Sequence, residues 1–258
     1  MDYNYHTHTY RCGHATGTPE EYILRAMENG IRYMGFSDHI PLLFEDGSEN
    51  IGVRVPVSKA RDYVTELLSL REKYRDKIDI SIGFESEYYP NCFDTMLTDA
   101  KLWGAEYLIL GQHYTKPECP VKATHAFVAT DDASFLEEHT NSVIKAIKTG
   151  VFTYVAHPDV LNFTGDIELY RQAARRICQA AREYHTPLEM NFLGIRGGRH
   201  YPNPMFWEIA GQEQSPVTFG FDAHRAIDAY DGDSLAVAEK LVQKYDLNYI
   251  GEPELIRI

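Results

Sequence analysis

The segment Asp2-Tyr3-Asn4-Tyr5-His6-Thr7-His8 introduces the pattern on which the fold prediction rests. Residues 2–6 form a short run typical of a β-strand, and the run leads directly into two histidines. The same order, a short strand followed at once by a residue that can bind a metal or a substrate, recurs along the chain. That repetition, more than any single motif, indicates how the chain folds.

Seven short apolar or β-branched runs are predicted as strands, at residues 2–6, 31–37, 78–84, 106–111, 151–156, 187–191 and 216–221. Helical patterns lie between them, at residues 19–29, 57–75, 93–103, 132–149, 166–184 and 234–245. The first helix has the clearest boundaries, because Thr18 to Glu21 combine an N-cap, a proline at the first helical position and a capping-box glutamate, and Gly30 follows its end. Strand–helix alternation repeated in this way predicts a parallel sheet of the α/β class.

The residues that follow the strands favour a closed barrel over an open sheet. In a barrel the carboxyl ends of all strands converge on one face, whereas an open sheet would string them along a long edge. We therefore predict one barrel domain of about seven strands spanning residues 1–258. The residues that would meet at its carboxyl face are His6, His8, Asp38, His39, Glu85, His113, His157, Asn191, Asp222 and His224.

Composition limits the classes of partner. The 258 residues have a formal net charge of −13, which argues against binding to nucleic acid or to an anionic membrane surface. The N-terminus lacks the pattern of a secretory signal, the apolar runs are too short to span a membrane, and the four cysteines show no disulfide or CxxC pattern. A cytoplasmic protein is expected, and its oligomeric state is not readable from the sequence.

Seven histidines and two carboxylates form a candidate metal centre. His6 and His8 lie two residues apart on one side of an extended segment, Asp222 and His224 repeat that spacing, and Glu85 can bridge two cations. Each motif alone is weak, since most HxH pairs are incidental, but their convergence on one face of a barrel is not expected by chance. We predict Glu85 and Asp222 as the catalytic carboxylates.

These motifs resemble the polymerase-and-histidinol-phosphatase (PHP) family. The resemblance covers almost the whole chain in order and includes SDHIPL at 37–42, GFESEY at 83–88, GQH at 111–113 and FDAH at 221–224. It implies a distorted seven-stranded β/α barrel with three divalent ions, for which the ligand types suit Zn, Mn or Fe. By resemblance, the three ligand sets are His6, His8, Glu85 and Asp222; Glu85, His113 and His157; and His14, His39 and His224.

Candidate substrate-binding residues lie in loops after the later strands. Arg196 follows the sixth strand in a glycine-rich stretch, and its guanidinium suits a phosphate dianion. Arg225, directly after His224, and His200, close to Arg196, are further candidates, although a structural role for His200 is as well supported. For His125 a structural role is favoured.

The predicted reaction is hydrolysis of a small phosphomonoester by a metal-bridging hydroxide, with the proton donor for the leaving group unassigned. SDHIPL and GFESEY are most similar to the histidinol-phosphatase branch, which implies L-histidinol phosphate as the substrate and a place in histidine biosynthesis. A second possibility is a PHP phosphoesterase acting on a nucleotide, a cyclic phosphodiester or a phosphotyrosine. An amidohydrolase-type barrel and a non-enzymatic metal-binding protein are the alternatives from other classes.

Overall fold

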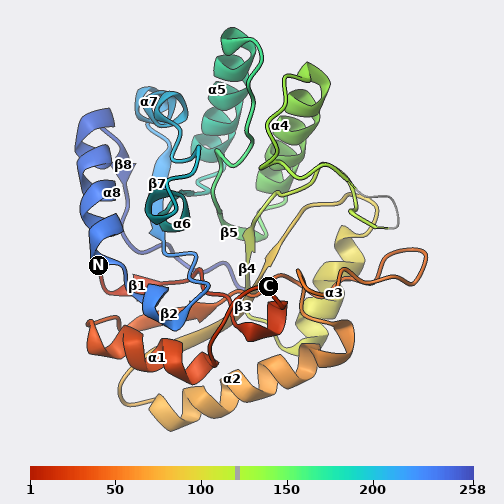
Figure 1. Ribbon diagram of the computed structural model, residues 1–258, viewed down its shortest axis with the longest axis vertical. Coiled ribbons are helices and arrows are strands. Elements are labelled where there is room, and N and C mark those ends of the chain that lie inside the picture. The colour runs from red at the N-terminus through yellow and green to blue at the C-terminus, as the bar shows by residue number, and fades with distance from the viewer. Residues whose placement is uncertain (120–122) are drawn as a thin grey trace.

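The protein is described by a computed structural model that covers residues 1–119 and 123–258 (Figure 1). Its sheet contains eight strands, each parallel to its neighbour and in the order of the sequence. They are β1 (Tyr3–Asn4), β2 (Tyr33–Phe36), β3 (Asp79–Ser86), β4 (Tyr107–Leu110), β5 (Phe152–Val155), β6 (Leu188–Asn191), β7 (Pro216–Gly220) and β8 (Asn248–Tyr249). All seven predicted strands are therefore confirmed.

Helices surround the strands on the outside, as Figure 1 shows. They are α1 (Pro19–Glu28), α2 (Ala60–Tyr74), α3 (Phe93–Trp103), α4 (Ala133–Lys148), α5 (Ile167–Glu183), α6 (Phe192–Arg196), α7 (Pro204–Glu213) and α8 (Gly232–Tyr245), with 3-10 turns η1 (Tyr10–Cys12), η2 (Val57–Lys59) and η3 (Ala226–Ala229). The predicted capping box begins α1, where the backbone N–H of Thr18 donates to Oε2 of Glu21 at 2.6 Å. The short α6 and the Asn203-capped α7 were not predicted.

A seam between the first and the seventh strand segments closes the barrel. Thr7 and Ala223 form a parallel bridge beyond the ends of β1 and β7, with the N–H of His8 donating to the carbonyl of Ala223 at 2.9 Å. At the other end of the strands β8 extends the sheet beyond β7, and the hydroxyl of Tyr3 lies 3.1 Å from that of Tyr249. The predicted distorted barrel is thus confirmed, with a two-residue eighth strand added.

The barrel interior below the strand ends is filled mainly by tyrosines. Tyr107 on β4 is fully buried, and its hydroxyl donates to the carbonyls of Tyr5 at 2.9 Å and of Phe36 at 3.2 Å. A Cβ at Gly35 would lie 2.2 Å from that hydroxyl, so the strand needs glycine there. One side chain therefore fixes the backbone just before His6 and just before Ser37.

The helices pack on the outer faces of the strands around a second, larger apolar core, which includes Tyr63, Phe84, Phe152 and Trp207. The C-terminal segment returns to the sheet, where the N–H of Ile258 donates to the carbonyl of Glu106. Across the residues that the structure describes, no helix has the length and apolar character needed to cross a membrane.

Two buried tyrosines allow a matched test of the interior. We expect Tyr107→Phe to lower the free energy of unfolding by about 1–3 kcal/mol, because it leaves two buried carbonyls without this donor. Tyr154→Phe is the control, since the buried Tyr154 hydroxyl has no hydrogen-bond partner within the described residues, and its removal should not destabilise. Denaturant unfolding of both variants measures the difference, and equal losses would contradict the assignment.

Candidate metal centre

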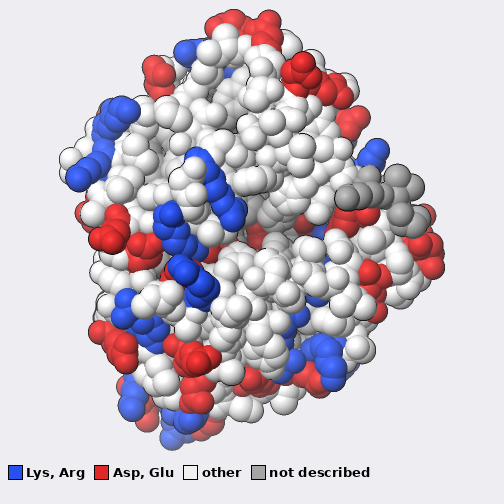
Figure 2. Space-filling view, in the orientation of Figure 1, with Lys and Arg blue, Asp and Glu red and all other residues white. Residues whose placement is uncertain are grey.

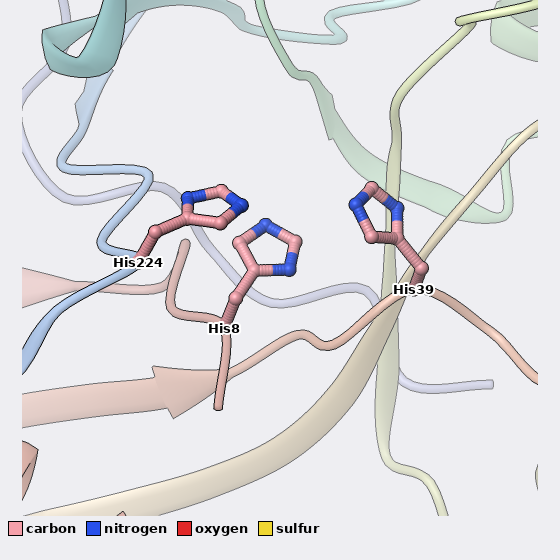
Figure 3. A group of neighbouring side chains, drawn as sticks. All are labelled: His8, His39 and His224. Carbon is pink, nitrogen blue, oxygen red and sulfur yellow. The ribbon is translucent and has the colours of Figure 1, made fainter. Parts of the chain in front are cut away.

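The nine predicted ligands meet at the carboxyl ends of the strands. Figure 3 shows three of them, His8, His39 and His224, which come from different segments and whose rings lie close to one another. The ring centroid of His8 is 4.3 Å from that of His224 and 4.6 Å from that of His39. Most of the set is buried, and His14 and His224 lie nearer the surface.

Four donor atoms form the most regular group. Nε2 of His6 and Nε2 of His8 are 3.1 Å apart, and Oδ1 of Asp222 lies 3.6 Å from the first and 3.4 Å from the second. Oε2 of Glu85 is 3.4 Å from His6 Nε2 and 3.3 Å from His8 Nε2. A tetrahedron with metal–ligand distances near 2.1 Å has edges of about 3.4 Å, so these spacings suit one divalent cation.

Glu85 also reaches a second group through its other oxygen. Oε1 lies 2.9 Å from Nε2 of His157 and 3.5 Å from Nε2 of His113. The carboxylate has this position because Gly111 has no side chain: a Cβ there would lie 1.8 Å from Oε1. The geometry therefore matches the bridging role predicted for Glu85.

The remaining three histidines adjoin both groups. Nε2 of His14 is 3.1 Å from Nε2 of His224, and the ring of His39 is 5.3 Å from that of His14. Nδ1 of His39 is also 3.3 Å from Oε2 of Glu85, and His39 can share a cation either with Glu85 and His113 or with His8 and His224. The three histidines of the predicted third set are therefore neighbours, but they also lie next to residues of the other two sets.

One buried atom shows that a cation fits this place. Oδ1 of Asp222 faces three imidazoles and has no hydrogen-bond partner within the described parts of the chain. An ionised buried oxygen without a donor is costly, and a divalent ion would supply the missing charge. The mixed nitrogen and carboxylate donors suit Zn²⁺, Mn²⁺ or Fe²⁺.

Two ligands have a strained backbone. His157 has φ 30° and Asp222 has φ 46°, in the left-handed region that non-glycine residues seldom adopt. Such positions persist where the surroundings hold them in place. The N–H of His157 donates to Oε2 of Glu189 at 3.0 Å, and Arg196 donates to the carbonyls of Phe221 and Asp222. The strained backbone therefore lies at two of the predicted metal ligands.

Burial and the neighbouring charges shift the pKa values of the site in opposite directions. Burial favours the protonated form of Glu85 and Asp222, but the histidines around them hold the pKa of each carboxyl well below its usual range. Burial lowers the pKa of His6, yet Glu189, Asp222 and Glu85 together raise it to about 10. The carboxylates are thus ionised at neutral pH, and a cation that binds His6 must displace a proton.

Glu189 contacts two of the predicted ligands and was not among the residues predicted from the sequence. It is fully buried on β6, and its Oε1 lies 2.7 Å from Nδ1 of His6. Its Oε2 accepts from Asn191, whose Nδ2 also donates to Oδ2 of Asp222 at 3.0 Å. Such outer partners orient ligand imidazoles. A glutamate between Leu188 and Met190 in the predicted strand run (187–191) was the signal available in the sequence.

The predicted substrate-binding residues do not gather at the cavity. The guanidinium of Arg196 lies behind Asp222, bonded to two backbone carbonyls, because α6 turns it away from the open face. Arg225 pairs with Asp228 at 2.7 and 2.9 Å, and Nε2 of His200 lies 2.8 Å from the carbonyl of Val160. The placement of Arg196 as a phosphate clamp therefore needs correction, and the polar groups of the other two are already paired.

Other side chains line the cavity above the metal centre, which has a volume of about 440 Å³. Arg199 is the basic residue on its wall. Within the described ranges it has no carboxylate within 4.0 Å, and its Nη1 donates to the hydroxyl of Tyr201 at 2.7 Å. Figure 2 shows basic side chains beside a hollow on this face, near the position of α6 in Figure 1. His125, predicted as structural, also lines the cavity, as do Tyr114 and Phe127.

A family model and several known proteins match most of this chain. The family model described as PHP domain matches residues 4–192. The chain is 24% identical over 228 residues to a probable histidinol-phosphatase of Deinococcus radiodurans, covering 85% of each, and 25% identical over 252 residues to a histidinol-phosphatase of Bacillus subtilis, covering 86% of this chain and 93% of the relative.

Solved structures share the fold. A histidinol phosphate phosphatase of Lactococcus lactis, complexed with zinc, L-histidinol and phosphate, has a TM-score of 0.73 at 17% identity, with 96% of this chain and 95% of that chain covered. A putative histidinol phosphatase of Listeria monocytogenes has a TM-score of 0.71 at 20% identity, with 90% and 99% covered.

The two glutamates at the end of β3 allow a test of the bridge. After equilibration with zinc, we expect the wild type to retain about two to three ions per chain. Glu85→Gln should lose more zinc and more kcat/KM than Glu87→Gln, since Glu85 contacts both groups of donors and Glu87 contacts only His113 among the nine. Loss of an outer partner costs about 10–100-fold, and Glu85→Gln should exceed that range. Elemental analysis and kinetics that rank Glu87→Gln as the worse variant would show that the bridge is misassigned.

Proposed function

The chain belongs to the PHP domain family, and from this premise we propose that it is a metal-dependent phosphomonoesterase that converts L-histidinol phosphate to L-histidinol and phosphate. The main support is the position of Glu85, whose two carboxylate oxygens each face a separate set of imidazoles at the floor of one cavity. Clustered divalent cations suit phosphoryl transfer, because they neutralise the phosphoryl oxygens and lower the pKa of water.

The residues of this chain would divide the work as follows. His6, His8, Asp222 and Glu85 would hold one cation, and Glu85, His113 and His157 would hold a second, while His14, His39 and His224 would supply the donors for a third. Glu189 holds Nδ1 of His6, which leaves Nε2 facing the donor atom of His8 and free to bind a cation. The ionised Glu85 and Asp222 balance the positive charge at this place.

Arg199 is proposed to contact the phosphate in place of Arg196. It lies on the cavity wall without an acidic partner among the described residues, and its guanidinium carbon is 5.3 Å from the ring centroid of Phe127. A guanidinium held between aromatic rings and open to the cavity suits a bidentate contact with a phosphate dianion.

The choice of histidinol phosphate rests on the relatives and on the cavity. Two relatives with high coverage bear the name histidinol-phosphatase or probable histidinol-phosphatase. A cavity of about 440 Å³ is of a size that holds a small molecule. Its walls include Tyr114, His125 and Phe127, which can pack against an imidazole ring. A role in histidine biosynthesis follows from this substrate.

A substrate panel tests the proposal directly. With added Zn²⁺ or Mn²⁺, we expect kcat/KM to be highest for L-histidinol phosphate among histidinol phosphate, a nucleoside monophosphate, a cyclic phosphodiester, a phosphotyrosine peptide and an amide. A strong chelator should abolish hydrolysis. Preference for another phosphoester would support a phosphoesterase but refute L-histidinol phosphate as its substrate. Full activity in chelator would refute the metal mechanism.

Arginine variants test the phosphate contact. Arg199→Ala should lose about 1.5–3 kcal/mol of transition-state stabilisation, which is about tenfold to a hundredfold in kcat/KM, with zinc content unchanged. Arg225→Ala should lose far less, because Arg225 is mostly exposed and paired with Asp228. Steady-state kinetics of the two variants, with elemental analysis beside them, measure the contrast. Equal small losses would leave phosphate binding to the cations alone.

A further inference from the structure

Arg54 is a buried cation that the nine ligands do not explain. In the sequence it lies between β2 and α2, and only 3% of its surface is exposed. A buried guanidinium requires paired partners, and breaking such a pairing leaves an uncompensated charge. No sequence motif assigns a role to this residue.

The three hydrogen-bonding nitrogens of Arg54 reach three different segments that follow strands. Nη1 donates to the carbonyl of Ile40 at 3.3 Å, Nη2 to Oε2 of Glu87 at 2.5 Å, and Nε to Oε1 of Glu118 at 2.6 Å. These partners follow β2, β3 and β4 in turn. The same three strands supply His39, Glu85 and His113, which form one of the groups able to hold a cation.

Glu87 connects Arg54 to His113, one of the predicted metal ligands. Its Oε2 is held by Arg54, and its Oε1 lies 2.9 Å from Nδ1 of His113. When Nδ1 of an imidazole donates to a carboxylate, Nε2 keeps its lone pair for a cation. Nε2 of His113 faces Glu85 at 3.5 Å, so the chain of contacts ends at the metal centre.

The same guanidinium fixes a wall of the cavity. Gly52 and Val53, which line it, directly precede Arg54 in the chain. Glu118 is held in turn by the hydroxyl of Tyr89 at 2.8 Å. Movement of Arg54 would therefore displace both this wall and the carboxylate behind His113.

We propose that Arg54 is a positioning residue that assembles the His39–Glu85–His113 group and thereby links cation binding at that group to the shape of the Gly52–Val53 wall. The inference rests on the proposed function: the assembly of the group depends on its metal centre alone, whereas the effect of the wall is tested with its substrate. Linkage of this kind is reciprocal, so a cation at the group also stabilises the wall.

Arg196 makes an analogous arrangement on the other side of the centre. It donates to the carbonyls of Phe221 and Asp222, beside the ligand Asp222. Each arginine thus holds the chain next to a different subset of ligands. Arg196→Met can therefore be compared with Arg54→Met, since each variant removes a partly or fully buried guanidinium.

Zinc titration of the full chain, stripped with chelator, tests the proposal without substrate. We expect Arg54→Met to weaken the binding of one zinc ion by about 10–100-fold, the range for loss of an outer partner. In a double-mutant cycle its effect should largely disappear when His113 is already alanine, and should persist when His224 is alanine. The effect of Arg196→Met should persist when His113 is alanine, because Arg196 holds the backbone of Asp222 instead. Additivity with both histidines, or unchanged zinc affinity, would overturn the assignment.

Folding is measured separately, by unfolding of each variant in chelator. If Arg54→Met does not fold, the same cycle uses Arg54→Met with Glu118→Gln, which removes one positive and one negative charge together. If neither protein folds while Glu118→Gln alone does, Arg54 serves stability only and the proposal is rejected.

Kinetics at saturating zinc test whether Arg54 also holds the Gly52–Val53 wall of the cavity. We expect Arg54→Met to raise KM for L-histidinol phosphate more than it lowers kcat, because the wall contacts the bound substrate rather than the cations. A fall in kcat with KM unchanged would contradict the link between the group and the wall. A wild type that binds zinc but hydrolyses no phosphomonoester would refute the proposed function, while the zinc cycle would still decide the role of Arg54 in assembling the group.

Discussion

The metal centre depends on one buried carboxylate. Glu85 is 1% exposed, and its two oxygens lie within 3.5 Å of nitrogens from His6, His8, His39, His113 and His157. A buried charge of this kind is tolerable only when it is paired and when its surroundings leave room for it. Gly111 provides the room, because any Cβ at that position would overlap Oε1. The strand ends are therefore placed around this side chain as much as around any cation.

Sequence patterns predicted the strands and the place where the candidate ligands meet, but not the residues that support them. Most candidate ligands could be placed because they follow strands, and a parallel barrel brings those ends together whatever the details of packing; His14, which follows the turn Tyr10–Cys12, was assigned by family resemblance. Arg54 and Glu189 could not, because their partners Glu118 and His6 lie 64 and 183 residues away and no local periodicity reports them. Arg196 was placed on the wrong side because the short α6, capped by Asn191, reverses the direction that an extended loop would have taken.

Two buried or half-buried arginines divide the support of the centre between them. Arg54 binds side-chain carboxylates and one carbonyl after β2, β3 and β4, while Arg196 binds backbone carbonyls after β7. Neither guanidinium is aimed at the cavity, whereas Arg199 is on its wall without an acidic partner in the described chain. Position in the fold, rather than residue type or nearness in sequence, separates the arginine that can meet a phosphate from those that hold the ligands.

Closure of the barrel and assembly of the first cation group take place at the same seam. Thr7 and Ala223 pair through their backbones, so their neighbours His6, His8, Asp222 and His224 project together from the opposite side of the two segments. The i, i+2 spacing of each motif thus places its two side chains on either side of the one bridged residue. Because the proposed ligands of one cation come from both sides of this seam, a cation held there would tie the first strand segment to the seventh. Binding there should contribute to the stability of the whole fold, since a ligand that binds only the folded state stabilises it by mass action.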